Sequence, residues 1–260
     1  MNTSTNGDYA DINGIRMYYE LYGPSAGIPL VLLHGGGSTI QTTFGRIIPF
    51  LSSRRSLIAV ELQAHGRTSD REGPISFEQD ADDVAALLQY LNISKADFFG
   101  FSNGANTALQ MAIRHPQLCN KIIAGSPLLK RNGTFPQFWE FINNGTFEQM
   151  PQAYKDAFLA VTPDPKKLMN LYEKCGERIR NLKDIPDEQL SAIACPALLI
   201  NGDRDVATAD HIMAMSKIIP DCRIAIIPGG HGEYIGEVTT LQTGDQKDVF
   251  IVSLLEKFLS

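Results

Sequence analysis

The stretch Ala96-Asp97-Phe98-Phe99-Gly100-Phe101-Ser102-Asn103-Gly104-Ala105 is the part of the chain that decides its expected fold. A short apolar run ends in Gly-x-Ser-x-Gly, and a pattern typical of a helix begins at once. In this context the motif places a serine at the apex of a sharp turn from strand to helix. The flanking glycines leave room where a side chain would collide with a neighbouring element. The stretch therefore predicts a projecting Ser102 hydroxyl beyond the carboxyl end of a buried strand.

The composition of the 260-residue chain is that of a globular protein with a sizeable core, since 43% of its residues are hydrophobic and 20% are charged. A net charge of −6 and the lack of a basic tract argue against nucleic-acid binding, which needs clustered cations. No apolar run approaches the roughly 18 residues of a membrane span, and Met1–Asp8 is too polar for a signal peptide. We therefore expect a cytoplasmic protein that does not bind membranes.

Apolar runs alternate with helical patterns along most of the chain. The turn signal Asn13-Gly14 predicts an opening hairpin, and the later unbroken apolar runs predict strands buried on both faces. The expected strands are 9–11, 15–21, 29–33, 57–62, 96–100, 121–124, 196–200 and 223–227, and the clearest expected helices are 76–91, 104–114 and 249–259. This alternation predicts an α/β fold with a mostly parallel, eight-stranded sheet and helices on both faces.

The segment from 126 to about 190 breaks this rhythm. It contains no convincing strand, and prolines and Asn-Gly pairs divide it into helix-sized pieces at 136–143, 151–160 and 166–175, with a weaker piece after them. It is also rich in aromatic residues. We interpret it as a helical insertion over the carboxyl edge of the sheet, where ligands bind in folds of this class. Some of its aromatic side chains would give the site an apolar roof.

A serine hydroxyl is a poor nucleophile unless a base removes its proton and a third group orients that base. Downstream of Ser102, an acid and a histidine each follow a predicted strand. The histidine is His231, and the acid is either Asp203 or Asp205 in the stretch Asn201-Gly202-Asp203-Arg204-Asp205. The chain order Ser, Asp, His is one of the orders in which this catalytic arrangement occurs.

Taken together, these motifs resemble those of α/β-hydrolase-fold proteins with a lid, similar to small carboxylesterases, acyltransferase-like proteins and meta-cleavage-product hydrolases. The resemblance covers residues 9–260 and implies a core of 1–125 and 191–260 with a helical cap at 126–190. It implies Ser102 as the nucleophile, His231 as the general base and Asp205, rather than Asp203, as the acid. The loop before His231 is one residue tighter than the usual family pattern.

The resemblance also implies residues that bind the substrate. The backbone N–H groups of Gly36 and Asn103 would form the oxyanion hole, with Gly37 as a further candidate donor. The expected substrate-binding residues are Gly35, Gly37, Phe101, Phe138 and Trp139. No cofactor is implied. Neither the cysteine nor the histidine spacing indicates a metal site, and the glycine-rich stretch after His34 lacks the pattern of a phosphate-binding loop.

The other four histidines have structural interpretations. His34, at a strand end, is expected to organise the oxyanion loop, and His65 resembles a histidine that lies beneath that loop in the family. His115 precedes a proline and is interpreted as a helix cap. His211 lies early in a helix and is expected to be exposed or a cap. Catalytic roles for His34 and His211 are the less favoured alternatives.

These features predict a carboxylesterase-like serine hydrolase that cleaves an ester or related acyl bond of a small, partly apolar molecule through an acyl-enzyme. Two alternatives use the same fold. One is an enzyme that performs acyl transfer, perhydrolysis or C–C bond cleavage, and the other is a ligand receptor that retains the three residues. The sequence leaves the substrate open, and it leaves open whether the protein is a monomer or a homodimer.

Overall fold

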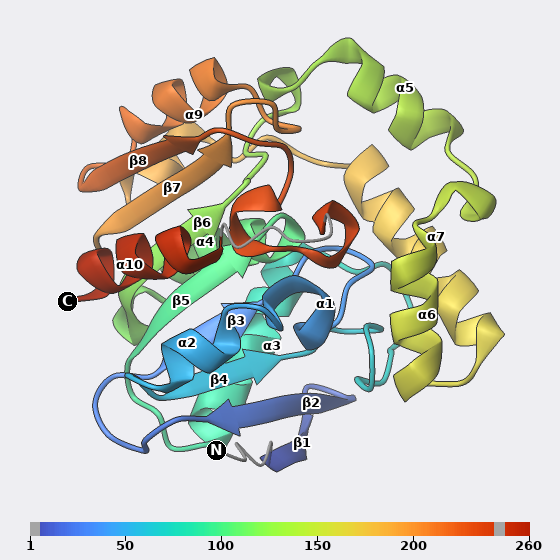
Figure 1. Ribbon diagram of the computed structural model, residues 1–260, viewed down its shortest axis with the longest axis horizontal. Coiled ribbons are helices and arrows are strands. Elements are labelled where there is room, and N and C mark those ends of the chain that lie inside the picture. The colour runs from blue at the N-terminus through green and yellow to red at the C-terminus, as the bar shows by residue number, and fades with distance from the viewer. Residues whose placement is uncertain (1–5, 242–247) are drawn as a thin grey trace.

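The computed structural model describes residues 6–241 and 248–260, so that residues 1–5 of the polar start discussed above lie outside it. Eight strands form one sheet in the order β1-β2-β4-β3-β5-β6-β7-β8, in which β2 is antiparallel to both its neighbours, β1 and β4, and the strands from β4 onwards in this order are parallel to one another. This confirms the predicted α/β architecture (Figure 1). The strands are β1 (Asn6–Ile12), β2 (Ile15–Tyr22), β3 (Leu30–Leu33), β4 (Leu57–Val60), β5 (Ala96–Phe101), β6 (Cys119–Gly125), β7 (Ala197–Gly202) and β8 (Cys222–Ile227).

Helices cover both faces of the sheet because successive residues of the central strands point to opposite sides. Leu33 and Phe98 pack under α3, α4 and α9, whereas Leu32 and Phe99 pack under α1, α2 and α10. Figure 1 shows these two layers. The helices are α1 (Ile40–Phe44), α2 (Ile48–Ser52), α3 (Phe77–Tyr90), α4 (Asn103–Arg114), α5 (Pro136–Asn144), α6 (Gln152–Val161), α7 (Pro165–Arg180), α8 (Asp187–Ser191), α9 (Ala209–Ser216) and α10 (Asp248–Leu259).

The stretch Ser76-Phe77-Glu78-Gln79 at the start of α3 has the form of a capping box in the sequence. Ser76 caps the helix by accepting a hydrogen bond from the backbone N–H of Gln79 at 3.1 Å. The Gln79 side chain donates from Nε2 to Asp83 Oδ1 at 2.9 Å, and the return bond from the Ser76 N–H to Gln79 is not among the hydrogen bonds of the described residues. The buried carboxylate of Asp80 pairs with Arg178 of α7 at 2.6 Å, which ties the helices between β6 and β7 to the core.

Between β6 and β7 lie α5 to α8, with no named strand among the described residues of this region. The predicted helical pieces are present, but α7 runs through Gly176 to Arg180 instead of ending at Cys175. In Figure 1, α5, α6 and α7 lie beyond the carboxyl ends of the parallel strands. No helix in the two described ranges combines the length and the apolar character that a bilayer crossing requires. The division into a core and a cap domain remains our prediction.

Candidate active site

Ser102 lies at the turn between β5 and α4 and has a strained backbone, with φ of 53° and ψ of −117°. The chain can turn this sharply only because both flanking glycines lack a Cβ. A Cβ on Gly100 would lie 1.9 Å from the carbonyl oxygen of Gly104, and one on Gly104 would lie 2.0 Å from the carbonyl oxygen of Leu33. The strand-to-helix turn expected from the Gly-x-Ser-x-Gly motif is therefore present, and its strain orients the Ser102 side chain.

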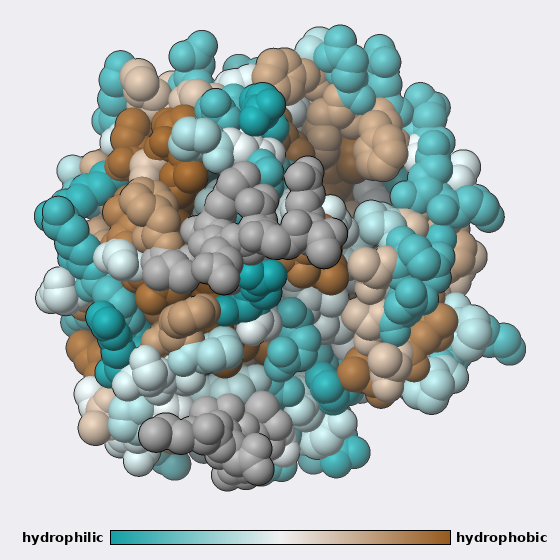
Figure 2. Space-filling model, viewed as in Figure 1, coloured by the Kyte–Doolittle hydropathy of each residue, from teal (hydrophilic) through white to brown (hydrophobic). Residues whose placement is uncertain are grey.

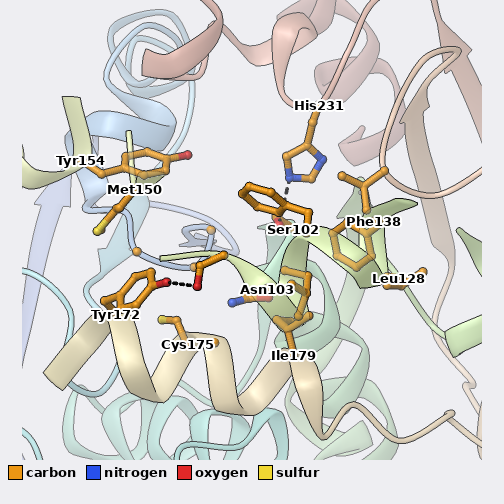
Figure 3. Close-up of a pocket in the computed structure, with 18 of the residues that line it drawn as sticks. Ser102, Asn103, Leu128, Phe138, Met150, Tyr154, Tyr172, Cys175, Ile179 and His231 are labelled. Carbon is orange, nitrogen blue, oxygen red and sulfur yellow. Dashed lines mark hydrogen bonds between the residues drawn. The ribbon is translucent and has the colours of Figure 1, made fainter. Parts of the chain in front are cut away.

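Three side chains that are far apart in the sequence form one hydrogen-bonded chain at the carboxyl edge of the sheet. His231, in the loop after β8, places Nε2 3.0 Å from Ser102 Oγ (Figure 3). Its Nδ1 lies 2.6 Å from Oδ1 of Asp205, which follows β7. The ring of Phe101 packs against the His231 imidazole with a centroid separation of 4.8 Å. A serine, an imidazole and a carboxylate in this order can remove a proton from the serine hydroxyl.

The second oxygen of Asp205 is held by groups that the sequence did not single out. Ser126 Oγ donates to Oδ2 at 2.6 Å, and the backbone N–H of Gly202 donates to the same oxygen at 3.0 Å. Tyr234 Oη lies 2.9 Å from Ser126 Oγ and completes the network. Burial alone would raise the pKa of the Asp205 carboxyl, but hydrogen bonds from His231, Ser126 and Gly202 outweigh burial and lower it. The carboxylate is thus kept ionised.

Asp203, the alternative acid, lies elsewhere. It is exposed, and its Oδ1 accepts a hydrogen bond from the backbone N–H of Gly229 at 2.8 Å. That contact joins the two loops after β7 and β8, which is the turn-stabilising role that a loop carboxylate commonly has. The structure thus brings Asp205, and not Asp203, to His231.

Two buried histidines organise the loop that follows β3. His34 accepts the backbone N–H of Leu62 on Nε2 at 3.0 Å, so its Nδ1 carries the proton that it donates to the Gly35 carbonyl at 2.7 Å. His65 accepts the backbone N–H of Gly37 on Nε2 at 3.1 Å. Burial lowers the pKa of His34 to about 4, and burial, followed by the proximity of the His34 imidazole and of the Arg178 charge, lowers the pKa of His65 well below its usual value. Both imidazoles are therefore neutral.

The hydrogen bond to His65 decides which oxyanion donors remain. Because the Gly37 N–H is already committed to His65, Gly37 is not a free donor, contrary to the wider expectation. Asn103 is the first residue of α4, so its N–H has no acceptor within the helix. Gly36 lies directly against the Asn103 side chain, since a Cβ on Gly36 would be 2.1 Å from Asn103 Nδ2. The structure thus brings Gly36 and Asn103 together beside Ser102.

A cavity of about 340 Å³ lies over Ser102 and His231. Among the predicted substrate-binding residues, Gly35, Gly37, Phe101 and Phe138 line it. Most of its other lining side chains are apolar and come from the segment between β6 and β7, notably Phe141, Ile142, Met150, Tyr154, Tyr172, Ile179 and Leu182. In Figure 2 apolar side chains gather beside α5, whereas hydrophilic ones cover much of the outer edge of the molecule.

The prediction for Trp139 was wrong. Trp139 does not line the cavity. Its Nε1 donates to the Arg131 carbonyl at 3.0 Å, and the Arg131 guanidinium stacks on its ring at 3.9 Å. Adjacent residues of a helix point about 100° apart, and here Phe138 faces the cavity while Trp139 packs against Arg131. The composition of the segment could not indicate which of the two turns inward.

The remaining histidines lie outside the cavity lining. His115 caps the end of α4, as expected, and its Nε2 lies 2.7 Å from Asp82 Oδ1. The expectation that His211 is exposed or a cap was wrong: it is buried, and its Nε2 accepts the backbone N–H of Leu129 at 3.3 Å. In the described part of the chain, no cluster of three or more histidine, cysteine, aspartate or glutamate side chains could hold a metal ion.

The chain is similar to known proteins both in sequence and in fold. A family model described as the alpha/beta hydrolase fold matches residues 28–182, more than half of the chain. The human protein named Serine hydrolase BPHL is 25% identical over 244 residues, covering 88% of this chain and 80% of that protein. The 3-oxoadipate enol-lactonase 2 of Acinetobacter baylyi is 26% identical over 212 residues, covering 75% and 78%. The crystal structure of an enol-lactonase from Burkholderia xenovorans superposes with a TM-score of 0.73 at 20% identity, covering 97% of this chain and 99% of that one.

Proposed function

The chain belongs to the alpha/beta hydrolase fold family, and we propose that it is a serine hydrolase that cleaves an ester, lactone or related acyl bond of a small, partly apolar molecule. The observation that carries the proposal is the continuous hydrogen-bonded chain from Ser102 through His231 to Asp205 beneath the cavity. The names of two curated relatives, a serine hydrolase and an enol-lactonase, support the reaction class.

In the first half of the proposed reaction, Ser102 Oγ attacks the carbonyl carbon of the bound acyl group while His231 Nε2 accepts the hydroxyl proton. Asp205 holds the imidazole in the tautomer whose Nε2 is free to accept, and its charge stabilises the imidazolium that forms. The backbone N–H groups of Asn103 and Gly36 would donate to the oxyanion. His231 then protonates the leaving oxygen, and an acyl-enzyme on Ser102 results.

In the second half, His231 takes a proton from a water molecule whose oxygen attacks the acyl carbon. The bond between that carbon and Ser102 Oγ then breaks, His231 returns the proton to Oγ, and the carboxylic acid product leaves. The apolar cavity walls limit the access of bulk water and strengthen the hydrogen bonds to the developing negative charge. Ser126 and Tyr234 contribute indirectly, because they hold Asp205 in its hydrogen-bonding position.

A fluorophosphonate probe tests the proposal directly, since it phosphonylates an activated serine. We expect the wild type to be labelled, with the label located on Ser102 by peptide mass spectrometry, and Ser102→Ala to remain unlabelled. Ser126→Ala is the comparison variant, because it removes another serine hydroxyl that lines the same cavity; its labelling should be slower, since Asp205 loses one hydrogen bond. It should still be labelled on Ser102.

Turnover should follow the same pattern. With p-nitrophenyl esters of increasing chain length, Ser102→Ala should lower kcat by about 10⁴-fold or more. Absence of labelling in a wild-type protein whose folding is verified by circular dichroism, or a label on a different residue, would refute the assignment of Ser102.

A further inference from the structure

Arg180, at the last turn of α7, stands out from the other residues that line the cavity. It is the one lysine, arginine, aspartate or glutamate among the described lining residues, most of which are apolar. Figure 3 shows α7 across the cavity from Ser102, with Cys175 and Ile179 directed towards it. Arg180 follows Ile179 directly, is exposed, and also lines the cavity. The cavity therefore combines an apolar body with one positive charge on the α7 side.

The position of the Arg180 guanidinium depends on a glycine one turn earlier. A Cβ on Gly176 would lie 2.8 Å from Nη1 and 3.4 Å from Cζ of Arg180, so the guanidinium lies across the bare backbone at Gly176. Helical side chains point towards the N-terminus, which places residues i and i+4 over one another. Glycine within a helix is destabilising compared with alanine. The Arg180 guanidinium occupies the space that a side chain at position 176 would fill. Gly176 and Arg180 both line the cavity.

Arg180 has no ion pair among the residues of 6–241 and 248–260. Its neighbours along the chain differ, because Arg178 pairs with Asp80 at 2.6 Å and Lys174 pairs with Asp70 at 2.6 Å. A second guanidinium lies close to the same helix end, since Arg131 Nη1 donates to the Arg180 carbonyl at 2.9 Å. Helix C-termini favour cations in general, but that preference explains neither the bare backbone at Gly176 nor the place of Arg180 in the cavity wall.

We propose that Arg180 binds a carboxylate of the substrate, and that the preferred substrates are esters or lactones whose apolar skeleton carries a carboxylate remote from the scissile bond. A planar guanidinium can bind a carboxylate through two parallel hydrogen bonds. Arg180 provides this partner, and the apolar walls accommodate the skeleton between it and Ser102. The overall charge of −6 repels anions, so that a local cation is needed to retain one. This inference rests on the proposed hydrolase function.

The test compares two esters of similar size, mono-p-nitrophenyl glutarate and p-nitrophenyl valerate. For Arg180→Gln, the ratio of kcat/KM for the anionic ester to that for the neutral ester should fall about tenfold, through a higher KM for the anionic ester. Gly176→Ala should lower the ratio as well, since it displaces the guanidinium without removing its charge. In the wild type the preference for the anionic ester should weaken in 0.5 M NaCl.

Lys183→Gln is the matched control, because it removes an exposed positive charge three residues away that does not line the cavity. It should leave the ratio unchanged. If Arg180→Gln left the ratio at the wild-type value, or if Lys183→Gln lowered it equally, the assignment of Arg180 would be overturned.

A binding measurement separates this inference from the proposed reaction. Ser102→Ala should bind hexanoate more tightly than hexanamide by titration calorimetry, and the additional change Arg180→Gln should abolish that preference. Turnover of both esters without any effect of Arg180 would overturn the carboxylate site alone. If neither ester is turned over while hexanoate binding depends on Arg180, the proposed hydrolysis falls and the carboxylate site stands.

Discussion

His34 and His65 follow β3 and β4, and His231 follows β8, so that all three imidazoles lie at the carboxyl edge of one sheet. The ring nitrogens of the first two are satisfied by backbone groups, and both side chains are fully buried. His231 instead lies between a carboxylate and a hydroxyl, and about a third of its side chain is exposed. The same residue type thus fixes a loop in one place and contacts Ser102 in the other, and the difference lies in the partners of the ring.

Replacing Asp205, the carboxylate partner of His231, should have the largest effect on kcat. In Asp205→Asn, the amide can donate to Nδ1 and favour the tautomer in which Nε2 carries the proton, so kcat should fall by about 10⁴-fold. Steady-state kinetics with a p-nitrophenyl ester measures this loss. Asp203→Asn is the matched control and should keep most of the wild-type rate, since Asp203 contacts Gly229 instead. The opposite result would mean that Asp203 is the acid.

The buried imidazoles of His34 and His65 should make the free energy of unfolding depend on pH. His34 has a pKa of about 4 when folded and 6.5 when unfolded, so between these values the unfolded chain binds a proton that the folded chain does not. Its contribution to the free energy of unfolding is complete above about pH 6.5 and should decrease by about 3 kcal/mol as the pH falls to 4. His65 and His211, whose pKa values are also lowered first by burial, act with the same sign.

Urea unfolding between pH 7 and pH 4 measures this loss. His34→Gln keeps groups that can donate and accept hydrogen bonds but cannot titrate, so it should flatten the dependence. An unchanged slope in that variant would show that His34 does not stay neutral in the folded protein.

A smaller effect should follow from removing the acceptor for the Gly37 N–H. In His65→Leu, the loop that carries Gly36 loses its anchor, and kcat should fall by about 10²-fold, comparable with the loss of one oxyanion donor. KM should change less, and His65→Gln should restore part of the rate because its amide oxygen can accept the Gly37 N–H. A loss of thermal stability with unchanged kcat would mean that His65 supports the fold without positioning the loop.

The sequence predicted those parts of the molecule that depend on local pattern. The apolar run to Phe101, the glycines at 100 and 104 and the helical spacing that follows allow one local geometry, and the structure has it. Parallel strands place their carboxyl ends at one edge, so loops after different strands were expected to meet there. Ser102, Asp205 and His231 do meet, while their chemical roles remain our proposal.

Other features depend on which side chains meet in space. Ser126 carried no motif, yet it holds Asp205 because β6 and β7 are adjacent and parallel. His211 appeared exposed because its local pattern does not show that the loop before α5 packs over it. The extension of α7 through Gly176 was missed because glycine usually weakens a helix.

The amino-acid sequence by itself determined the sheet, the turn at Ser102 and the set of candidate side chains, because these follow from hydrophobic periodicity and from backbone conformations that few residues can adopt. Tertiary structure decided that Asp205 rather than Asp203 reaches His231, that Phe138 rather than Trp139 faces the cavity, and that Gly37 is bound to His65. Each of these is a choice between chemically similar neighbours. Local sequence does not distinguish them, because the partner that settles each choice comes from a distant part of the chain.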